Sequence, residues 1–281
     1  MPLPVADCLA QTVLSIAGSD PSGGAGIQAD LKTFTRLGVY GAAAITCLTA
    51  QNTLGVTAVY ALAPEIVAEQ VRVVLADLQV SHIKIGMIGS ALIASAVNQV
   101  LDDFQGEIIY DPVLTSTSGM PLLVSAADLP DLDGLISRVT VLTPNLVELR
   151  QISGEDCLSA QDSLSAARGL LGRYPRLQAI VIKGGHFAAR SEVDNYLLLA
   201  TEPQAPIKIS MPRLAVKNSH GTGCTFASAF AAYRLLGADY ELACRQSSSF
   251  VWRLLRAGMN VNYGHGSSGL PHHLLKAESG R

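Results

Sequence analysis

The chain has 281 residues and a formal net charge of −3, with 15% charged and 49% hydrophobic side chains. This composition excludes a disordered chain, which combines low hydrophobicity with high net charge. It also argues against a nucleic-acid partner, since proteins that bind nucleic acids present a basic face. So few charges predict extensive buried surface, in a thick core, an oligomer interface or both.

The sequence shows no signs of a membrane span, a secretory leader or a disulfide scaffold. Apolar segments such as 41–50 and 225–232 fall short of the roughly 18 residues that a membrane span needs. No basic residue precedes Lys32, so the positive start of a secretory signal is missing. Five cysteines occur without a CxxC pair, which argues against a disulfide scaffold or a zinc ribbon. We therefore expect a cytoplasmic protein with reduced thiols and no membrane partner.

Short apolar runs alternate with segments of helical periodicity along the first two thirds of the chain. The first run, 13–17, enters a glycine-rich turn at 18–26, and the spacing of apolar residues predicts a helix over 27–37. Further strands are predicted at 42–48, 83–88, 107–110, 139–143 and 179–183, and further helices at 65–79, 91–104, 146–152 and 159–173. This alternation is typical of βαβ units around a mostly parallel sheet, and predicts an α/β fold.

The last third of the chain departs from this alternation. Two runs, 195–200 and 207–211, flank a turn that contains proline and predict an antiparallel hairpin at one edge of the sheet. Two helices are then predicted, over 225–236 and 241–258. No linker, repeat or low-complexity stretch interrupts the chain. We therefore predict a single domain over 1–281, with flexible tails at 1–11 and 272–281.

The first glycine cluster contains Gly24-x-Gly26-x-x-Ala29, between a predicted strand and a predicted helix. This spacing matches a relaxed dinucleotide-binding fingerprint. The fingerprint also requires an acidic residue about 20 positions later, which binds the ribose. No Asp or Glu occurs between Asp30 and Glu65, which argues against a nicotinamide cofactor. A glycine turn with a packing role alone remains the alternative.

A second glycine cluster, 220–225, directly precedes a predicted helix made largely of small residues. Backbone N–H groups at such a helix start point toward one spot, where the helix dipole favours an anion such as phosphate. A cysteine at this position should have a lowered pKa, ~3.5–7.5 against ~8.5 for a free thiol. The pattern therefore predicts that Cys224 acts as a base or a nucleophile near pH 7. The alternative is a buried structural thiol.

Polar residues follow several predicted strands: Asp111, Asn145, Glu148 and Lys183. Ligands of open parallel sheets bind beyond the carboxyl ends of the strands, so these side chains are expected on one rim. Carboxylate and amide oxygens suit Mg²⁺, and a lysine suits phosphate. Signatures of a Walker P-loop, a serine hydrolase and a zinc protease are absent from the sequence. Together with the two glycine turns, the pattern predicts phosphotransfer from a nucleoside triphosphate.

These residues resemble a known family. The segments AGSDPSGGAGIQADLKT (17–33), LTAQNT (48–53), KIGMIGS (84–90), YDPV (110–113), TPNLVEL (143–149), VIKGGH (181–186) and NSHGTGCTFASA (218–229) occur in the order of the hydroxymethylpyrimidine/phosphomethylpyrimidine kinases of thiamine biosynthesis. The similarity extends over nearly the whole chain and includes Gly264-His265-Gly266. These kinases are part of the ribokinase-like superfamily.

The resemblance implies a three-layer αβα sandwich with a mostly parallel sheet and an antiparallel edge. It implies phosphorylation of 4-amino-5-hydroxymethyl-2-methylpyrimidine (hydroxymethylpyrimidine), and then of its monophosphate, by ATP with Mg²⁺, in a homodimer.

The resemblance also implies roles for residues at matching positions. Asp30 and Gln51 would hydrogen-bond the pyrimidine, with backbone contacts from Gly18 and an apolar wall from Met87. Cys224 would be the general base; the amides of Gly221, Thr222 and Gly223 would form an anion hole, the last two also contacting the nucleotide. Lys183 would bind the nucleotide phosphates, and Asp111 and Glu148 would hold Mg²⁺.

Two other functions remain open from the sequence. Relatives on this fold phosphorylate vitamin B6, so a pyridoxal or pyridoxine kinase is the alternative enzyme, although the polar Gln51 favours a pyrimidine. A non-catalytic nucleotide-binding regulator would need to lack the base or the acidic residues, yet Cys224, Asp111 and Glu148 are all present. The sequence departs from the family at 214–216 and 114–118, which leaves the adenine contacts and some phosphate contacts open.

Overall fold

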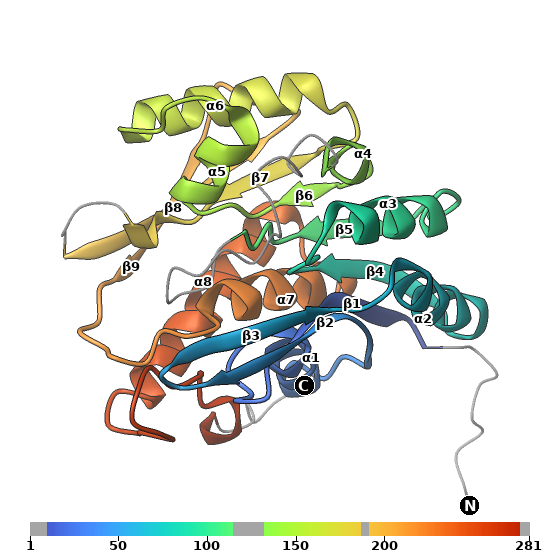
Figure 1. Ribbon diagram of the computed structural model, residues 1–281. Helices are drawn as coiled ribbons and strands as arrows, with labels where there is room; N and C mark the ends of the chain where they lie inside the picture. Colours follow the sequence, from blue (N-terminus) through green and yellow to red (C-terminus); the bar gives the residue numbers. More distant parts are fainter. Residues whose placement is uncertain (1–9, 115–131, 187–190, 276–281) are drawn as a thin grey trace, which may run out of the picture.

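The computed structural model describes residues 10–114, 132–186 and 191–275 (Figure 1). Its nine described strands form one sheet in the order β3-β2-β1-β4-β5-β6-β7-β8-β9. The strands are β1 Thr12–Ser19, β2 Gly41–Asn52, β3 Gly55–Ala61, β4 Val80–Ile85, β5 Glu107–Tyr110, β6 Val141–Leu142, β7 Ala179–Ile182, β8 Glu192–Leu199 and β9 Ile207–Pro212.

The middle of the sheet is parallel and both of its edges are antiparallel. Neighbouring strands from β2 to β7 pair in parallel, as the alternation of strands and helices predicts. At one edge β7, β8 and β9 pair antiparallel, which confirms the predicted hairpin. At the other edge β2 and β3 form a second hairpin that the sequence did not reveal. The apolar run at 42–48 marks only the first half of β2, because its extension to Asn52 pairs with the mixed sequence of β3.

Helices cover both faces of the sheet, in agreement with the expected three-layer sandwich (Figure 1). One face packs against α2 Pro64–Asp77, α3 Ala91–Val100, α4 Leu132–Ile136, α5 Leu146–Ser153 and α6 Ala160–Arg173. The other packs against α1 Gly26–Arg36, α7 Thr222–Leu235 and α8 Tyr240–Ala257. All but the short α4 were predicted from periodicity. Among the described helices, none combines the length and the apolar character needed to cross a membrane.

The core lies on both sides of the sheet. Neighbouring residues of one strand belong to different layers: Ile108 packs on the side of α3, and Ile109 on the side of α7. Both are fully buried. A strand covered on both faces needs no polar side, which explains the continuous apolar runs and the low charge of the chain. Helix α7 can pack closely against the sheet because alanine side chains are small, and its alanines at 227, 229, 231 and 232 are fully buried there.

The C-terminal segment is held against the fold beyond the predicted boundary of the tail. His272 to Leu274 form a short 3-10 helix, and the His272 ring is buried with Nε2 3.0 Å from Oγ1 of Thr33. The described residues 272–275 of the predicted C-terminal tail thus include one side chain, His272, that packs against α1. Residues 1–9 and 276–281 of the predicted tails lie outside the described residues.

A fully buried ion pair joins four elements beneath the carboxyl end of the sheet. The ammonium of Lys84, on β4, lies 2.9 Å from both carboxylate oxygens of Asp30, on α1. Ser15, on β1, and Ser228, on α7, each donate a hydrogen bond of 2.6 Å to that carboxylate. Burial opposes the charged ammonium, but the Asp30 carboxylate outweighs it and raises the pKa of Lys84.

We expect Lys84→Met to lower the free energy of unfolding by about 3–5 kcal/mol, because the variant leaves the Asp30 charge buried without a counter-ion. Urea denaturation followed by circular dichroism measures this loss. In the double variant Lys84→Met/Asp30→Asn the loss should be smaller, since the neutral amide accepts a hydrogen bond from one serine through its oxygen and donates to the hydroxyl of the other through its nitrogen. A single-variant loss below about 1 kcal/mol would show that the pair contributes no more than an exposed one.

Candidate active site

A cavity of about 750 Å³ opens at the carboxyl ends of the parallel strands. Parallel α/β sheets bind ligands at this edge. One end of the cavity is polar and is lined by the strand-end residues and both glycine turns. The other end is apolar and lies between β9 and α8. The predicted site residues that line the cavity are Gly18, Gln51, Met87, Asp111, Glu148, Lys183, Gly221, Thr222, Gly223 and Cys224.

The two glycine turns touch one another at the polar end of the cavity. Gly221 has φ +79°, and a Cβ there would lie 1.8 Å from the carbonyl oxygen of Gly24. Gly26 has φ +57°, and its Cβ would lie 2.2 Å from the carbonyl oxygen of Gly18. A side chain at either position would therefore force backbone apart in a conformation that glycine alone adopts readily. Contact between the two turns explains the glycine at 221, and contact within the first turn explains the glycine at 26.

Asp20 and His220 connect these turns through side chains that the sequence analysis did not single out. The Asp20 carboxylate accepts hydrogen bonds from the backbone amides of Ser22, Gly24 and Ala25. Its Oδ2 also lies 2.8 Å from Nε2 of His220. Burial alone would raise the pKa of Asp20, but the bonds from His220 and Ser22 lower it overall. Asp20 is therefore ionised and holds the first turn together through these hydrogen bonds. Its role as a turn residue could have been predicted from the Asp-Pro-Ser sequence, which is typical of turns.

Three charged side chains meet where β5, β6 and β7 end, as predicted. Nζ of Lys183 lies 2.5 Å from Oδ1 of Asp111 and 3.6 Å from Oε2 of Glu148. Burial opposes the Lys183 ammonium, but Asp111 and Glu148 raise its pKa overall. Thr143 donates a further hydrogen bond of 3.3 Å to Oδ1 of Asp111. The lysine is thus held as a cation facing the cavity.

Asp111 and Glu148 fit the requirements of Mg²⁺. Oδ2 of Asp111 is buried and has no hydrogen-bond partner among the residues that the structure describes. Glu148 closes a capping box on α5, because its Oε2 accepts the amide of Asn145 at 2.7 Å. Burial raises the pKa of Glu148 to about 7, with Lys183 opposing and Asp111 adding to the rise. No cluster of three such ligands occurs in the described part of the chain. Mg²⁺ commonly uses one or two carboxylates and completes its shell with phosphates and water.

Cys224 is buried in the first turn of α7, and its thiol is neutral rather than activated. Burial raises the pKa of Cys224 to about 11. The Lys84 ammonium opposes this rise, while Asp111 and Asp30 add to it. The prediction of a lowered pKa is therefore wrong for the protein without ligands. The favourable potential of the helix N-terminus and of a nearby cation does not offset the free-energy cost of transferring the thiolate out of water.

The predicted anion hole needs a smaller correction. Thr222 donates its amide to the carbonyl of Ser219 at 3.3 Å, so this N–H already has an acceptor within the turn. Gly223 lies beside the charged cluster: a Cβ there would be 3.2 Å from Nζ of Lys183 and 3.5 Å from Oδ2 of Asp111. The first turn of a helix leaves its N–H groups without helical acceptors. The start of α7 and the Lys183 ammonium therefore present positive potential to the same small volume.

Asp30 is the one predicted site residue that does not line the cavity. Its side chain is fully buried, and both carboxylate oxygens accept bonds from Lys84 and the two serines. The expectation that Asp30 hydrogen-bonds a pyrimidine directly is corrected: Asp30 supports the floor of the site instead. At this end Gly18 lies under Met87, and a Cβ on Gly18 would be 3.3 Å from the methionine sulfur.

The apolar end of the cavity was not found from the sequence. Leu214 and Val216 line it, within the segment that departs from the family pattern. Further apolar lining comes from strands β8 and β9, and from α8: Val193, Met211, Val251, Trp252 and Leu255. Trp252 is fixed by a hydrogen bond of 3.0 Å from Nε1 to the carbonyl of Pro212. Such a slot suits a flat aromatic ring.

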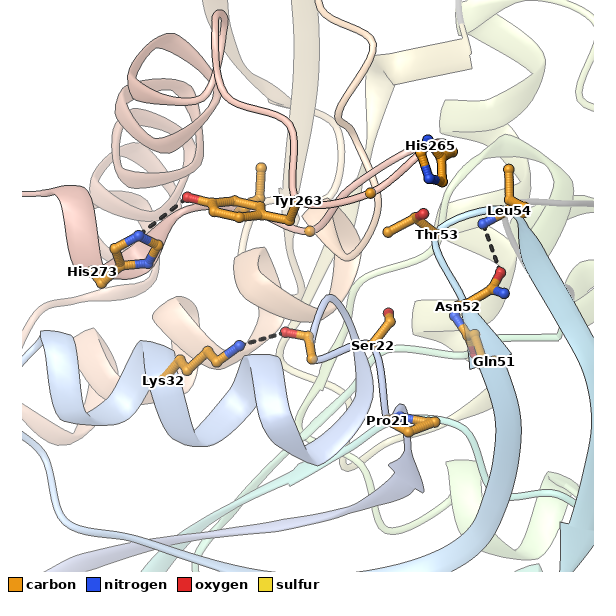
Figure 2. Close-up of a pocket in the computed structure, with 14 residues that line it drawn as sticks. Pro21, Ser22, Lys32, Gln51, Asn52, Thr53, Leu54, Tyr263, His265 and His273 are labelled. Atoms are coloured by element: carbon orange, nitrogen blue, oxygen red, sulfur yellow. Dashed lines mark hydrogen bonds between the residues drawn. The ribbon is translucent and has the colours of Figure 1, made fainter.

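A second, smaller hollow of about 600 Å³ lies on the other side of Gln51 (Figure 2). The turn between β2 and β3, the first glycine turn and the segment around Tyr263 surround it. Tyr263 bonds to His273 at 3.2 Å, and Lys32 bonds to the carbonyl of Gly23 at 2.7 Å. Gln51 is thus shared by two hollows, since it lines both.

Comparisons with known proteins agree on one family. Residues 20–269 match the family model described as phosphomethylpyrimidine kinase. The chain is 38% identical over 261 residues to the hydroxymethylpyrimidine/phosphomethylpyrimidine kinase of Escherichia coli, covering 92% of this chain and 96% of that protein. It is 36% identical to the thiamine biosynthesis bifunctional protein ThiED of Geobacter sulfurreducens, covering 96% of this chain but about half, 54%, of that longer protein.

Solved structures give the same fold. A pyridoxal kinase from Staphylococcus aureus in complex with ADP has a TM-score of 0.83 at 28% identity, with 94% of both chains covered. A phosphomethylpyrimidine kinase from Clostridium difficile has a TM-score of 0.74 at 33% identity, covering 87% of this chain and 99% of that one. The three-layer fold with its mostly parallel sheet is therefore shared with both kinds of kinase.

We expect the Cys224 thiol to titrate with a midpoint near 11, as its burial requires. The thiolate absorbs in the ultraviolet, and a variant in which the other four cysteines are replaced by serine reports on this thiol alone. The same variant with Cys224→Ala supplies the blank. A midpoint below pH 8 would show that the helix N-terminus outweighs burial.

Proposed function

Because the chain belongs to the phosphomethylpyrimidine kinase family, we propose that it uses ATP to phosphorylate hydroxymethylpyrimidine and then its monophosphate, in thiamine biosynthesis. The observation that carries the proposal is the arrangement of a single cavity. Charged groups suited to phosphate and Mg²⁺ lie at its centre, between an apolar slot and a polar end that carries Gln51. A nucleotide and a small polar ring fit such an arrangement from opposite ends.

The nucleotide occupies the apolar half in this proposal. Its adenine lies in the slot beside Trp252 and Val216, and its phosphates extend toward Lys183 and the start of α7. Asp111 and Glu148 are the residues that would hold Mg²⁺, which when bound would neutralise charge on the transferring phosphates. The unpartnered Oδ2 of Asp111 supports this role, because a buried carboxylate oxygen otherwise pays an uncompensated desolvation cost.

Hydroxymethylpyrimidine occupies the polar half. The Gln51 carboxamide offers both a donor and an acceptor, which matches the amino group and the adjacent ring nitrogen of an aminopyrimidine. Gly18 leaves room for the flat ring, and Met87 supplies an apolar wall. The hydroxymethyl group then points toward Cys224 and the start of α7.

Cys224 is the group in this proposal that removes the hydroxyl proton as the phosphoryl group arrives. In the protein without ligands burial raises the pKa of this thiol to about 11, with Asp111 and Asp30 adding to the rise and Lys84 opposing it. This role therefore requires that bound metal and substrates bring this pKa down before the thiolate accepts the proton. The developing charge on the phosphoryl oxygens falls beside the Lys183 ammonium and the amides of Gly223 and Cys224. Most of the rate enhancement comes from positioning and electrostatics, as in phosphoryl transfer generally.

Vitamin B6 kinase activity is the second candidate function, because the pyridoxal kinase from S. aureus shares this fold at 28% identity. Gln51 favours the pyrimidine, since its paired donor and acceptor complement adjacent amino and ring nitrogen groups. Turnover of pyridoxal far above that of hydroxymethylpyrimidine would reverse this preference.

We further propose a cytoplasmic homodimer. Leu48 and Tyr60 are paired across the edge hairpin and are 45% and 61% exposed, and Ile66 and Val73 on the nearby α2 are about half exposed. An apolar surface of this kind is typical of an interface. Light scattering that gives the mass of one 29.5 kDa chain would exclude the dimer.

The proposed function predicts that two ATP are consumed for each hydroxymethylpyrimidine, with the diphosphate as the final product. Coupled detection of ADP, together with mass spectrometry of the products, measures both quantities. One ATP and a monophosphate product would limit the enzyme to the first step. No consumption above the rate without substrate would exclude the function.

We expect Cys224→Ser to lower kcat by about 100-fold or more, because a hydroxyl is a poor base near pH 7. Binding of ATP, measured by calorimetry, should remain. Cys157→Ser is a matched control, since this half-buried thiol lies in the loop between α5 and α6 and does not line the cavity. Near-normal turnover of Cys224→Ser would remove the thiol from the mechanism.

A further inference from the structure

Gln51 has a hydrogen-bonding environment that admits only one orientation of its side-chain amide. As placed, its Nε2 lies 3.0 Å from Nε2 of His220, and its Oε1 lies 3.2 Å from Oγ1 of Thr49. Oxygen and nitrogen of an amide have the same shape, so the hydrogen-bond partners must decide between the two orientations. Each of the two partners can be assigned from its other contacts.

The first partner, Nε2 of His220, carries a hydrogen. This atom lies 2.8 Å from Oδ2 of Asp20. The Asp20 carboxylate accepts three backbone amides and is ionised, so it can only accept. Nε2 of His220 must therefore be the donor in this contact, whether the ring is neutral or charged. A nitrogen that carries a hydrogen cannot accept one from the Gln51 amide nitrogen. The amide atom 3.0 Å from it must therefore be the oxygen, which shares this one N–H with Asp20 in a three-centre hydrogen bond.

The second partner, the hydroxyl of Thr49, is compatible with this orientation, because it has a nearer acceptor than Gln51 for its hydrogen. Its oxygen lies 3.0 Å from the backbone carbonyl of Ser19, which can only accept. The single hydroxyl hydrogen is thus directed at Ser19. Thr49 is then left with lone pairs toward Gln51, and these can accept a hydrogen bond from the amide nitrogen.

We infer that His220 fixes the Gln51 amide with its oxygen toward His220 and its nitrogen toward Thr49. His220 is a positioning residue that selects the orientation of the substrate. One lone pair of the amide oxygen and one hydrogen of the nitrogen stay available to the cavity. An aminopyrimidine then binds with its amino group on the His220 side and its ring nitrogen on the Thr49 side. This second step rests on the proposed function. Figure 2 shows Gln51 at the end of β2, next to Asn52 at the turn into β3.

Kinetics of His220 variants test the inference. His220→Leu removes the donor, and we expect it to raise the KM for hydroxymethylpyrimidine about tenfold, with a smaller change in kcat and in the KM for ATP. His220→Gln places an amide N–H near the position of Nε2 and should restore most of the loss. Equal losses in the leucine and glutamine variants would contradict the inference.

A double-variant cycle with Gln51→Ala separates positioning from structural support. If His220 acts through Gln51, His220→Leu should not raise the KM further once the amide is gone. An equal rise in both backgrounds would mean that His220 only holds the Asp20 turn, and would overturn the inference.

Imidazole ¹H–¹⁵N correlation spectra of the wild-type protein provide a measurement that needs neither turnover nor a stable variant. The inference requires a protonated Nε2 on His220 at neutral pH in the protein without ligand. A ring with hydrogen on Nδ1 alone would overturn it. If the wild type fails to phosphorylate hydroxymethylpyrimidine while Nε2 is protonated, the proposed function fails and the assignment of the amide stands.

Discussion

Charged side chains buried at the carboxyl ends of the parallel strands determine how the surrounding elements are arranged. Lys183 pairs with Asp111 and lies near Glu148, and beneath them Lys84 pairs with Asp30. Away from water, each of these charges needs a partner within a few ångströms. One buried carboxylate oxygen, Oδ2 of Asp111, has no hydrogen-bond partner among the described residues and faces the start of α7. The protein therefore keeps an acceptor available at the point where a metal and phosphates would bind.

The glycine turns bring the two halves of the cavity together around this cluster. Gly221 and Gly24 touch at a distance that no side chain permits, and Asp20 joins their turns through His220. The first turn lies beside Gln51, and the second begins α7 with Cys224. A single contact between turns nearly 200 residues apart thus sets the separation between the amide that recognises a substrate ring and the thiol that faces its reacting group.

The sequence predicted the parts of this site that follow from topology. Asp111, Glu148 and Lys183 each follow an apolar run, and parallel strands bring their carboxyl ends to one edge. What escaped prediction depends on three-dimensional packing. Asp30 forms an ion pair with Lys84, which lies on a strand more than 50 residues away in the sequence. Burial raises the pKa of Cys224, whereas the sequence predicted that it is lowered. Strand β3 and the slot around Trp252 carry mixed sequences, because each is only half covered.

A crystal structure with hydroxymethylpyrimidine, Mg²⁺ and a non-hydrolysable ATP analogue would show directly how the site is used. We expect Mg²⁺ bound to Oδ2 of Asp111, the adenine beside Trp252, and the substrate hydroxyl within hydrogen-bond reach of the Cys224 sulfur. A metal bound elsewhere, with Oδ2 still unpartnered, would contradict this expectation. So would a pyrimidine ring that makes no contact with Gln51.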